Sequence, residues 1–326
     1  MQLGRQPSSG SPSSTPLVPS VVYGSDGESF SSGTVAPFDV YEAAGDTTPL
    51  LSLQLSTTRN GTSESLATEN AANLVLTGFA MPELNPGSDA TAGPALDLFA
   101  VSPDGQVTGL DRAARIQVVH GSFEDGATYT VSSEGDTVAS GLTQLTASPT
   151  LSVSSGVGLN VRVRNGGSTL LTQDFSVETG ATERWVVVGE TSSTLDVARV
   201  PFQSERAAFG TFEANAVHAA AFLGASDFHL SPIANVSLES PEVENVTLGG
   251  SAPAPTVRPF SDQRFTVTGV GGQTPVASFD VLLSTSVFSE EDTLLFIVTG
   301  SAELSGQGLD LLVVNQDGET AMFDPN

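Results

Sequence analysis

One segment recurs along this chain, and the repetition constrains the fold more than any other feature of the sequence. Its clearest copy spans residues 111–189. In that copy an alternating stretch, residues 159–165, runs into the turn Gly166-Gly167 and a second strand, and an apolar strand then ends at Gly189. Alternation of apolar and polar residues around a glycine turn is typical of a β-hairpin. The segment is therefore predicted to be a unit of antiparallel strands.

Parts of this unit return on both sides of the central copy. The alternating strand and its glycine turn recur at residues 264–272, and the apolar strand recurs at residues 74–78 and 294–300. A last strand closes the first and third copies at residues 95–101 and 309–314. Two or three domains are expected at 326 residues. We therefore predict a Ser/Pro-rich tether and three β-sandwiches, at residues 1–17, 18–108, 109–203 and 204–326.

The chain is predicted to be all-β. Short β-branched strands between Gly-, Ser- and Thr-rich turns favour tandem antiparallel β-sandwiches, Ig-like or transthyretin-like, over a barrel or a helical fold. The Ala-rich residues 213–223 are the best helical candidate, but they overlap the repeated Val217-His218, so we interpret them as irregular or strand. The first copy lacks a clear front half. A shorter sandwich is the preferred interpretation, and an edge strand supplied by a neighbour is the alternative.

The chain is strongly acidic. It has 37 Asp and Glu residues against 11 basic ones, all of them arginine, and a formal net charge of −26. Such a charge repels nucleic acid and anionic membranes, so neither is expected as a partner. It suits solubility, cation binding or a salty medium, and the simplest interpretation is a solvated surface.

The absence of cysteine excludes a disulfide framework, a thiolate zinc site and a cysteine nucleophile. No apolar run approaches the roughly 18 residues that span a membrane, so direct membrane insertion is not expected. Residues 1–4 lack the apolar core of a signal peptide, and the Ser/Pro-rich residues 6–16 are typical of a disordered tether. Our hypothesis is that Met1 stands in place of a processed end, such as the lipid-bearing cysteine of a lipoprotein.

The central copy contains Ala114-Arg115-Ile116-Gln117-Val118-Val119-His120-Gly121-Ser122, then a glycine-turn hairpin, and then Trp185-Val186-Val187-Val188-Gly189. In these residues it resembles an exported bacterial and archaeal family called domain of unknown function 4397. The third copy keeps part of the opening as Val217-His218-Ala219-Ala220, and the first copy resembles the family only in its back half. Phe123-Glu124-Asp125-Gly126 replaces the family's acidic-proline stretch. The resemblance implies exported tandem sandwiches on lipoproteins or cell-wall proteins, and it implies no catalytic residue.

Three histidines are the first candidates for chemistry. His120 and His218 hold equivalent positions in two copies, and His229 alternates with Phe228 and Leu230. No His-x-His or His-Glu-x-x-His spacing is present. We interpret the first two as packing or hydrogen-bonding residues of the fold and expect His229 to face solvent. No catalytic, cofactor-binding or metal-ligating residue is assigned.

Neighbouring carboxylates are the next candidates. Glu124-Asp125 and Glu290-Glu291-Asp292 could serve a glycosidase only at a fixed separation in a cleft, and their turn-like context predicts solvated loops. Asp26-Gly27-Glu28 and Asp317-Gly318-Glu319 are Asp-Gly turns rather than EF-hand loops. A calcium site between domains stays open as an alternative, and no other cofactor is expected. Gly271-Gly272 lies in a predicted hairpin, where positive φ explains it.

Two further patterns bear on function. The glycosylation sequon, which matters only in a host that glycosylates, occurs at Asn60-Gly61-Thr62, Asn235-Val236-Ser237 and Asn245-Val246-Thr247. No Gly-x-Ser-x-Gly elbow is present, so a serine hydrolase is not expected.

These observations predict a non-enzymatic, exported protein of the cell surface or envelope, with a structural, adhesive or display role. Its partner is expected to be an unidentified protein or glycan at the cell surface. The alternative is an accessory module that binds carbohydrate or protein ligands. That alternative calls for exposed aromatic residues, whereas the chain has one Trp and three Tyr, and Trp185 lies in a core-like apolar run.

Overall fold

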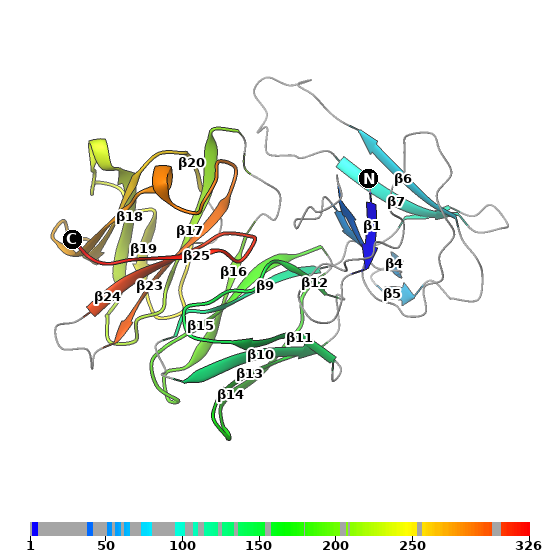
Figure 1. Cartoon of the computed structure of the whole chain (residues 1–326), viewed down its shortest axis with the longest axis horizontal. Helices are drawn as coiled ribbons and strands as arrows, with labels where there is room; N and C mark the ends of the chain where they lie inside the picture. Colours follow the sequence, from blue (N-terminus) through cyan, green and yellow to red (C-terminus); the bar gives the residue numbers. More distant parts are fainter. Residues whose placement is uncertain are drawn as a thin grey trace. The chain divides into compact units, whose positions relative to one another are not determined.

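The structure, a computed structural model, is built from β-strands (Figure 1). It describes residues 2–5, 38–41, 51–53, 56–59, 62–65, 73–79, 95–101, 107–109, 114–122, 126–133, 136–153, 158–178, 180–202, 207, 209–252, 256–301 and 308–326. These residues form strands β1 to β25 and two 3-10 turns, Ile233–Asn235 and Leu283–Thr285, and none of them lies in an α-helix. The predicted all-β fold is confirmed.

The middle of the chain forms two four-stranded sheets, which together we call the middle sandwich. The outer sheet has the order β11–β10–β13–β14, and the junction sheet has the order β12–β9–β15–β16. The strands are β9 (Ala114–His120), β10 (Ala127–Ser133), β11 (Asp136–Leu142), β12 (Leu151–Val153), β13 (Leu159–Asn165), β14 (Ser168–Phe175), β15 (Thr182–Val188) and β16 (Asp196–Pro201).

The last third of the chain forms a second pair of sheets, the C-terminal sandwich. One sheet has the order β19–β18–β21–β22, and the other has the order β20–β17–β23–β24–β25. The strands are β17 (Thr211–His218), β18 (Ser226–Pro232), β19 (Val243–Val246), β20 (Thr256–Pro259), β21 (Gln263–Gly269), β22 (Pro275–Val281), β23 (Thr293–Ser301), β24 (Gly308–Val314) and β25 (Thr320–Phe323). The Ala-rich segment that begins at Glu213 therefore enters strand β17, as interpreted above.

The two sandwiches share one strand order in these sheets, so the segments that repeat in the sequence also repeat in the topology. The outer sheet of the middle sandwich, β11–β10–β13–β14, has the same order as the sheet β19–β18–β21–β22 of the C-terminal sandwich. Strands β10, β13 and β14 therefore correspond to β18, β21 and β22. The register agrees as well, because Tyr129 pairs with Val163 in one sandwich and Phe228 pairs with Val267 in the other. Gly166 and Gly271 have φ of +55° and +67° in the corresponding hairpins, as their turns predict.

Aromatic side chains fill the core of the C-terminal sandwich. Phe228 and Phe265 come from one sheet and Phe296 from the other, and all three are buried. The rings of Phe265 and Phe296 stack with centroids 5.6 Å apart. Because the cluster draws side chains from both sheets, these sheets pack face to face as a sandwich.

Short strands are also described before residue 110. They form a sheet β1–β2–β3 (Gln2–Arg5, Phe38–Tyr41, Leu51–Leu53), a hairpin β4–β5 (Ser56–Arg59, Thr62–Ser65) and a sheet β6–β7–β8 (Asn73–Phe79, Ala95–Val101, Val107–Gly109). The predicted apolar strands at residues 74–78 and 95–101 lie in β6 and β7. Gln2–Arg5 pairs with Phe38–Tyr41, so this part of the predicted tether is a strand, because its backbone groups find a partner strand. Residues 6–17 lie outside the described part of the chain.

The contacts divide the chain into two compact units. One contains residues 1–115, 151–157 and 176–181, and the other contains residues 116–150, 158–175 and 182–326. The second unit thus includes most of the middle sandwich and all of the C-terminal sandwich. These two sandwiches meet within it.

Candidate functional site: the junction between two sandwiches

Two strands of the second unit are buried on both faces. Residues 184–188 of β15 are all buried, and so are residues 293–300 of β23. A sandwich strand with one solvated face alternates between apolar and polar residues, whereas a strand covered on both faces reads as a continuous apolar run. Each of these strands therefore faces its own core on one side and another element on the other side.

That other element is the neighbouring sandwich. Apolar side chains of the two facing sheets form one cluster, which we call the junction core. The middle sandwich contributes Val119, Val186, Val188, Ala198 and Val200, and the C-terminal sandwich contributes Val217, Ala219, Leu295, Ile297, Leu312 and Val314. Leu145, Ala147 and Leu248 pack against its edge. The two sandwiches are thus joined by an apolar contact rather than by a solvated linker.

Two glycines permit the close approach of the sandwiches. A Cβ atom on Gly121 would lie 3.1 Å from Val186 Cγ1 and 3.2 Å from Ile297 Cγ2. A Cβ atom on Gly318 would lie 2.7 Å from the backbone carbonyl of Ser148, and Gly318 also has φ of +87°. Backbone cannot give way as a flexible side chain can, so any larger residue at 318 would force the sandwiches apart there.

Arg184 crosses the junction near the first residues of β15 and β23. Its Nε donates a hydrogen bond to Gln117 Oε1 at 2.6 Å, and its Nη2 donates to the carbonyl oxygen of Thr293 at 2.6 Å. Its guanidinium also lies over the ring of Phe202, 4.4 Å from the centroid. The side chain is fully buried. The cation of one sandwich is therefore held by the backbone of the other.

Carboxylates of the C-terminal sandwich balance this buried charge. Burial lowers the pKa of Arg184, while the nearby carboxylates of Glu213 and Asp292 raise it. The guanidinium keeps its proton, because arginine has an ordinary pKa far above neutrality. Glu213 and Asp292 are themselves buried. A buried cation with carboxylates close by is an arrangement in which removing one partner is costly.

An amide network extends from Arg184 into the turn after β24. Gln117 Nε2 donates to the carbonyl oxygens of Ser148 and Asn315, at 3.0 and 2.6 Å. Gln316 Nε2 donates to Asp292 Oδ1 at 2.8 Å, and Gln316 Oε1 accepts from the Thr293 N–H at 2.8 Å. The sequence predicted an Asp-Gly turn at Asp317-Gly318, and the two residues before it, Asn315 and Gln316, are buried parts of the junction.

Further hydrogen bonds cross the junction at other points. Thr299 Oγ1 donates to the Gly121 carbonyl at 2.7 Å, and the Gly189 N–H donates to the Ala219 carbonyl at 3.0 Å. The Thr150 hydroxyl donates to the Gln316 carbonyl at 2.7 Å. The polar contacts therefore surround the junction core from several elements, which limits sliding of one sheet over the other.

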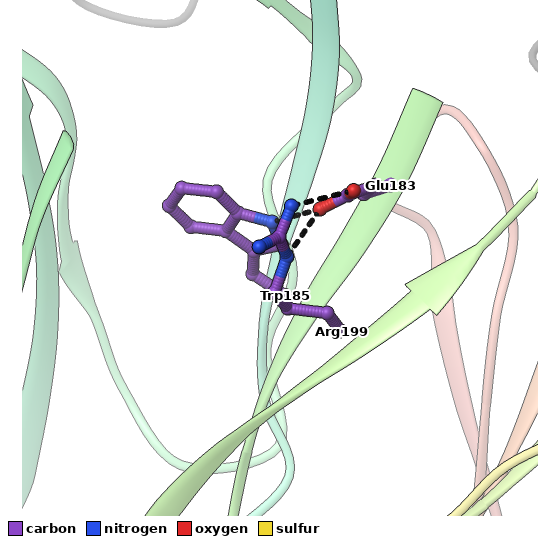
Figure 2. A network of polar contacts seen from close by, with 3 residues as sticks. All are labelled: Glu183, Trp185 and Arg199. Atoms are coloured by element: carbon purple, nitrogen blue, oxygen red, sulfur yellow. Dashed lines mark hydrogen bonds and ion pairs between the residues drawn. The ribbon is translucent and has the colours of Figure 1, made fainter. Parts of the chain in front are cut away.

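Beside the junction, three side chains of the middle sandwich form a second polar group (Figure 2). Trp185 Nε1 donates to Glu183 Oε2 at 2.9 Å, and Arg199 Nε and Nη2 each donate to one oxygen of the same carboxylate at 2.7 Å. The Trp185 ring is buried and lies 5.1 Å from that of Phe175. The indole is thus a core residue, as its apolar run predicted, and it offers no exposed surface on which a ligand could stack.

The three histidines are all buried. His120 lies against Tyr129 and His218 against Phe228, at corresponding positions of the two cores. Burial lowers the pKa of His120 to about 4 and also lowers that of His218. The packing interpretation of these two residues agrees with this placement. The expectation that His229 faces solvent is wrong, because its side chain is buried and its Nε2 lies 3.1 Å from Thr268 Oγ1.

The carboxylate candidates separate in the structure. Asp292 is buried at the junction, so the prediction of a solvated loop is wrong for it, while Glu290 is exposed. The backbone N–H of Glu319 and that of Asp317 donate to Asn315 Oδ1, which makes this segment a side-chain-capped turn. Within the described ranges no group of three or more metal-ligating side chains is found.

The remaining candidates are placed as follows. Asn235 and Asn245 of two sequons are exposed, and Asn245 has φ of +50°. Glu124-Asp125, Asp26-Gly27-Glu28 and Asn60 lie outside the described residues.

Sequence reasoning did not find the junction residues. A signal for them exists in hindsight, because Arg184 and Gln117 are long polar side chains set inside strands that otherwise continue as apolar runs. Such a residue must find a buried partner or remain unsatisfied. The neighbouring sequence does not identify the partner, since Gln117 and Asn315 are 198 residues apart.

No family model matches this chain, and no curated protein is significantly similar to it in sequence. The family resemblance of the central copy therefore stays a prediction. None of the helical segments in the described ranges is long and apolar enough to cross a membrane.

Proposed function

We propose that this chain is a structural protein of the cell surface, in which at least two tandem sandwiches are locked together as a stiff unit. The observation that supports this proposal is the junction, where an apolar core and a buried cation join the two sheets. Domains within one chain ordinarily move relative to each other unless their interface is large and hydrophobic. Such stiffness suits a protein that spans or supports an envelope layer.

The charge of the chain and the use of its buried polar residues are consistent with this role. The chain carries a net charge of −26, which keeps an exported protein soluble and prevents collapse onto anionic envelope components. The buried side chains of Arg184, Gln117 and Gln316 donate hydrogen bonds to other residues of the fold. Adhesion or display would use the same stiff unit as a support for a binding face.

Surface location is tested with intact cells of the native host. Protease added outside the cells should degrade the full chain, while a cytoplasmic marker protein stays intact. The chain should be recovered in the envelope or medium fraction rather than with that marker. Recovery of a protease-protected chain with the cytoplasmic marker would overturn the proposal.

Stiffness is tested by calorimetry of the full chain. We expect the two sandwiches to unfold in one cooperative transition, because the junction core belongs to both. Substitution of Gly318 by Leu, which places a side chain against the Ser148 backbone, should split that transition into two. A wild-type chain that already unfolds in separate steps for these sandwiches would contradict the stiff unit.

A further inference from the structure

The outer sheet of the middle sandwich presents two arginines to solvent. Arg162 and Arg164 are exposed on β13, where the buried residues Val161 and Val163 alternate with them. Side chains two apart on a strand share a face and lie about 7 Å from each other. The two guanidiniums therefore form a pair on the outward face of the sheet.

Hydroxyl side chains flank this pair on both neighbouring strands. Arg162 pairs in register with Thr130 of β10 and Thr172 of β14. Arg164 pairs with Thr128 and Thr169 on the same two strands. Residues directly opposite in an antiparallel sheet lie on one face. We call the two arginines and the four threonines the arginine face.

The arginine face is unusual in so acidic a chain. Four other described arginines are used within the fold, because Arg199, Arg258 and Arg264 pair with carboxylates and Arg184 is buried at the junction. Among the residues that the structure places, no carboxylate lies within ion-pair distance of Arg162 or Arg164. Their charge is therefore available to a ligand.

The C-terminal sandwich shows that the fold does not require these arginines. By the shared register, Thr266 and Thr268 hold the positions of Arg162 and Arg164. Both threonines are buried among their neighbours, and the adjacent Arg264 is paired with Asp280. The same sheet thus folds with small, β-branched residues at these sites.

We propose that the arginine face binds an anionic polysaccharide that carries carboxylate or sulfate groups. A guanidinium matches the planar, bidentate geometry of such groups, and the threonines supply hydroxyls for the sugar hydroxyls. The anchors of protein interfaces are arginines together with buried aromatic side chains such as Trp and Tyr. The exposed large hydrophobic residues of the described chain all lie at or beyond Phe209, outside this sandwich, so the arginine face lacks the aromatic part of such an anchor. The proposal does not depend on the stiffness of the junction.

The net charge of the chain determines how this binding responds to salt. A charge of −26 repels a polyanion at long range, while the arginines attract it at contact. Screening within about 8 Å at physiological salt removes the long-range repulsion first. Binding is therefore expected to rise from very low salt to a maximum and then to fall as the contacts themselves are screened.

The test uses the full chain and immobilised polysaccharides. Alginate supplies carboxylates, dextran sulfate supplies sulfates, and neutral dextran is the uncharged control. Retention on at least one anionic polymer, with none on dextran, is expected near physiological salt. The double variant Arg162→Gln/Arg164→Gln should bind that polymer at least tenfold more weakly, since two charge-assisted contacts are lost.

Arg264→Gln is the control variant, because it removes one arginine charge from a half-buried ion pair on the corresponding strand. It should leave retention within twofold of the wild type. Equal loss in Arg264→Gln and the double variant, or no retention of the wild type at any salt, would overturn the proposal.

Polyglutamate is the competitor that tests the other class of partner. Stronger binding to polyglutamate than to either polysaccharide would assign the face to an acidic protein instead and would also overturn the proposal.

Discussion

Strands β13 and β15 of the middle sandwich have the same length of seven residues, yet only β13 alternates. In β13, Leu159, Val161 and Val163 are buried, and the residues between them are half-buried or exposed. In β15 every residue from position 184 onwards is buried. The difference lies in what covers the second face, because solvent meets one sheet and another sandwich meets the other. A continuous apolar run in a sandwich strand thus indicates a domain junction.

The comparison is tested most strongly by placing a charge on each strand. Val186→Asp in β15 introduces an unpaired carboxylate into the junction core and should lower the free energy of unfolding by about 3–5 kcal/mol. Arg162→Asp in β13 changes an exposed residue and should stay within about 0.5 kcal/mol of the wild type. Denaturant titration of both variants measures the difference. Similar losses in the two would show that β15 has no second partner in solution.

A second prediction contrasts the buried arginine with an exposed one. Arg184→Met removes the buried cation and leaves Gln117 Oε1 and the Thr293 carbonyl without their donor. It should lower the free energy of unfolding by about 3 kcal/mol. Arg199→Met breaks the partly exposed ion pair with Glu183 and should cost under about 1 kcal/mol. If the order of the two effects is reversed in thermal and denaturant unfolding, the buried network does not hold the junction.

A third prediction concerns the pH dependence of stability that His120, on the core side of the junction sheet, produces. His120 is neutral in the fold because burial lowers its pKa from 6.5 to about 4. The unfolded chain therefore binds the extra proton first as the pH falls below 6.5, and stability is lost until about pH 4, where the folded form is protonated as well. The loss from this residue is about 3 kcal/mol at most.

The matched variant His120→Gln carries no titrating group and should show a shallower fall of stability between pH 6.5 and pH 4. His229→Gln, on the other sheet of the C-terminal sandwich, should change the profile less, because its imidazole is less strongly desolvated and Asp227 raises its pKa. Thermal midpoints measured across this range distinguish the two. An unchanged slope in His120→Gln would show that this residue is not neutral in the core.

Much of the fold could be predicted from local pattern. Alternation around Gly166 and Gly271 predicts hairpins, since positive φ at a turn is a property of a few neighbouring residues. The equivalence of His120 and His218 could be predicted from the repeated sequence around them, and both occupy the same place in their cores. The strand interpretation of the Ala-rich segment also followed from this repetition and not from propensity.

The candidate site was not predictable in the same way. Asp292 belongs to a carboxylate-rich turn in the sequence, and only the packing of the middle sandwich places it beside Arg184. His229 lies in a strand that alternates in sequence, but its side chain is buried and contacts Thr268. Burial of a polar side chain depends on what lies above it, and alternation along one strand does not record that.

The sequence by itself determined the all-β class, the hairpins and the repetition of one strand order, because these depend on residues close together in the chain. The tertiary structure decided which face of each sheet is covered, where Arg184 finds its carboxylates, and which arginines remain exposed. These features depend on contacts between segments as distant as Gln117 and Asn315. The free energy of such contacts comes from burying both partners together, so neither segment reveals it alone.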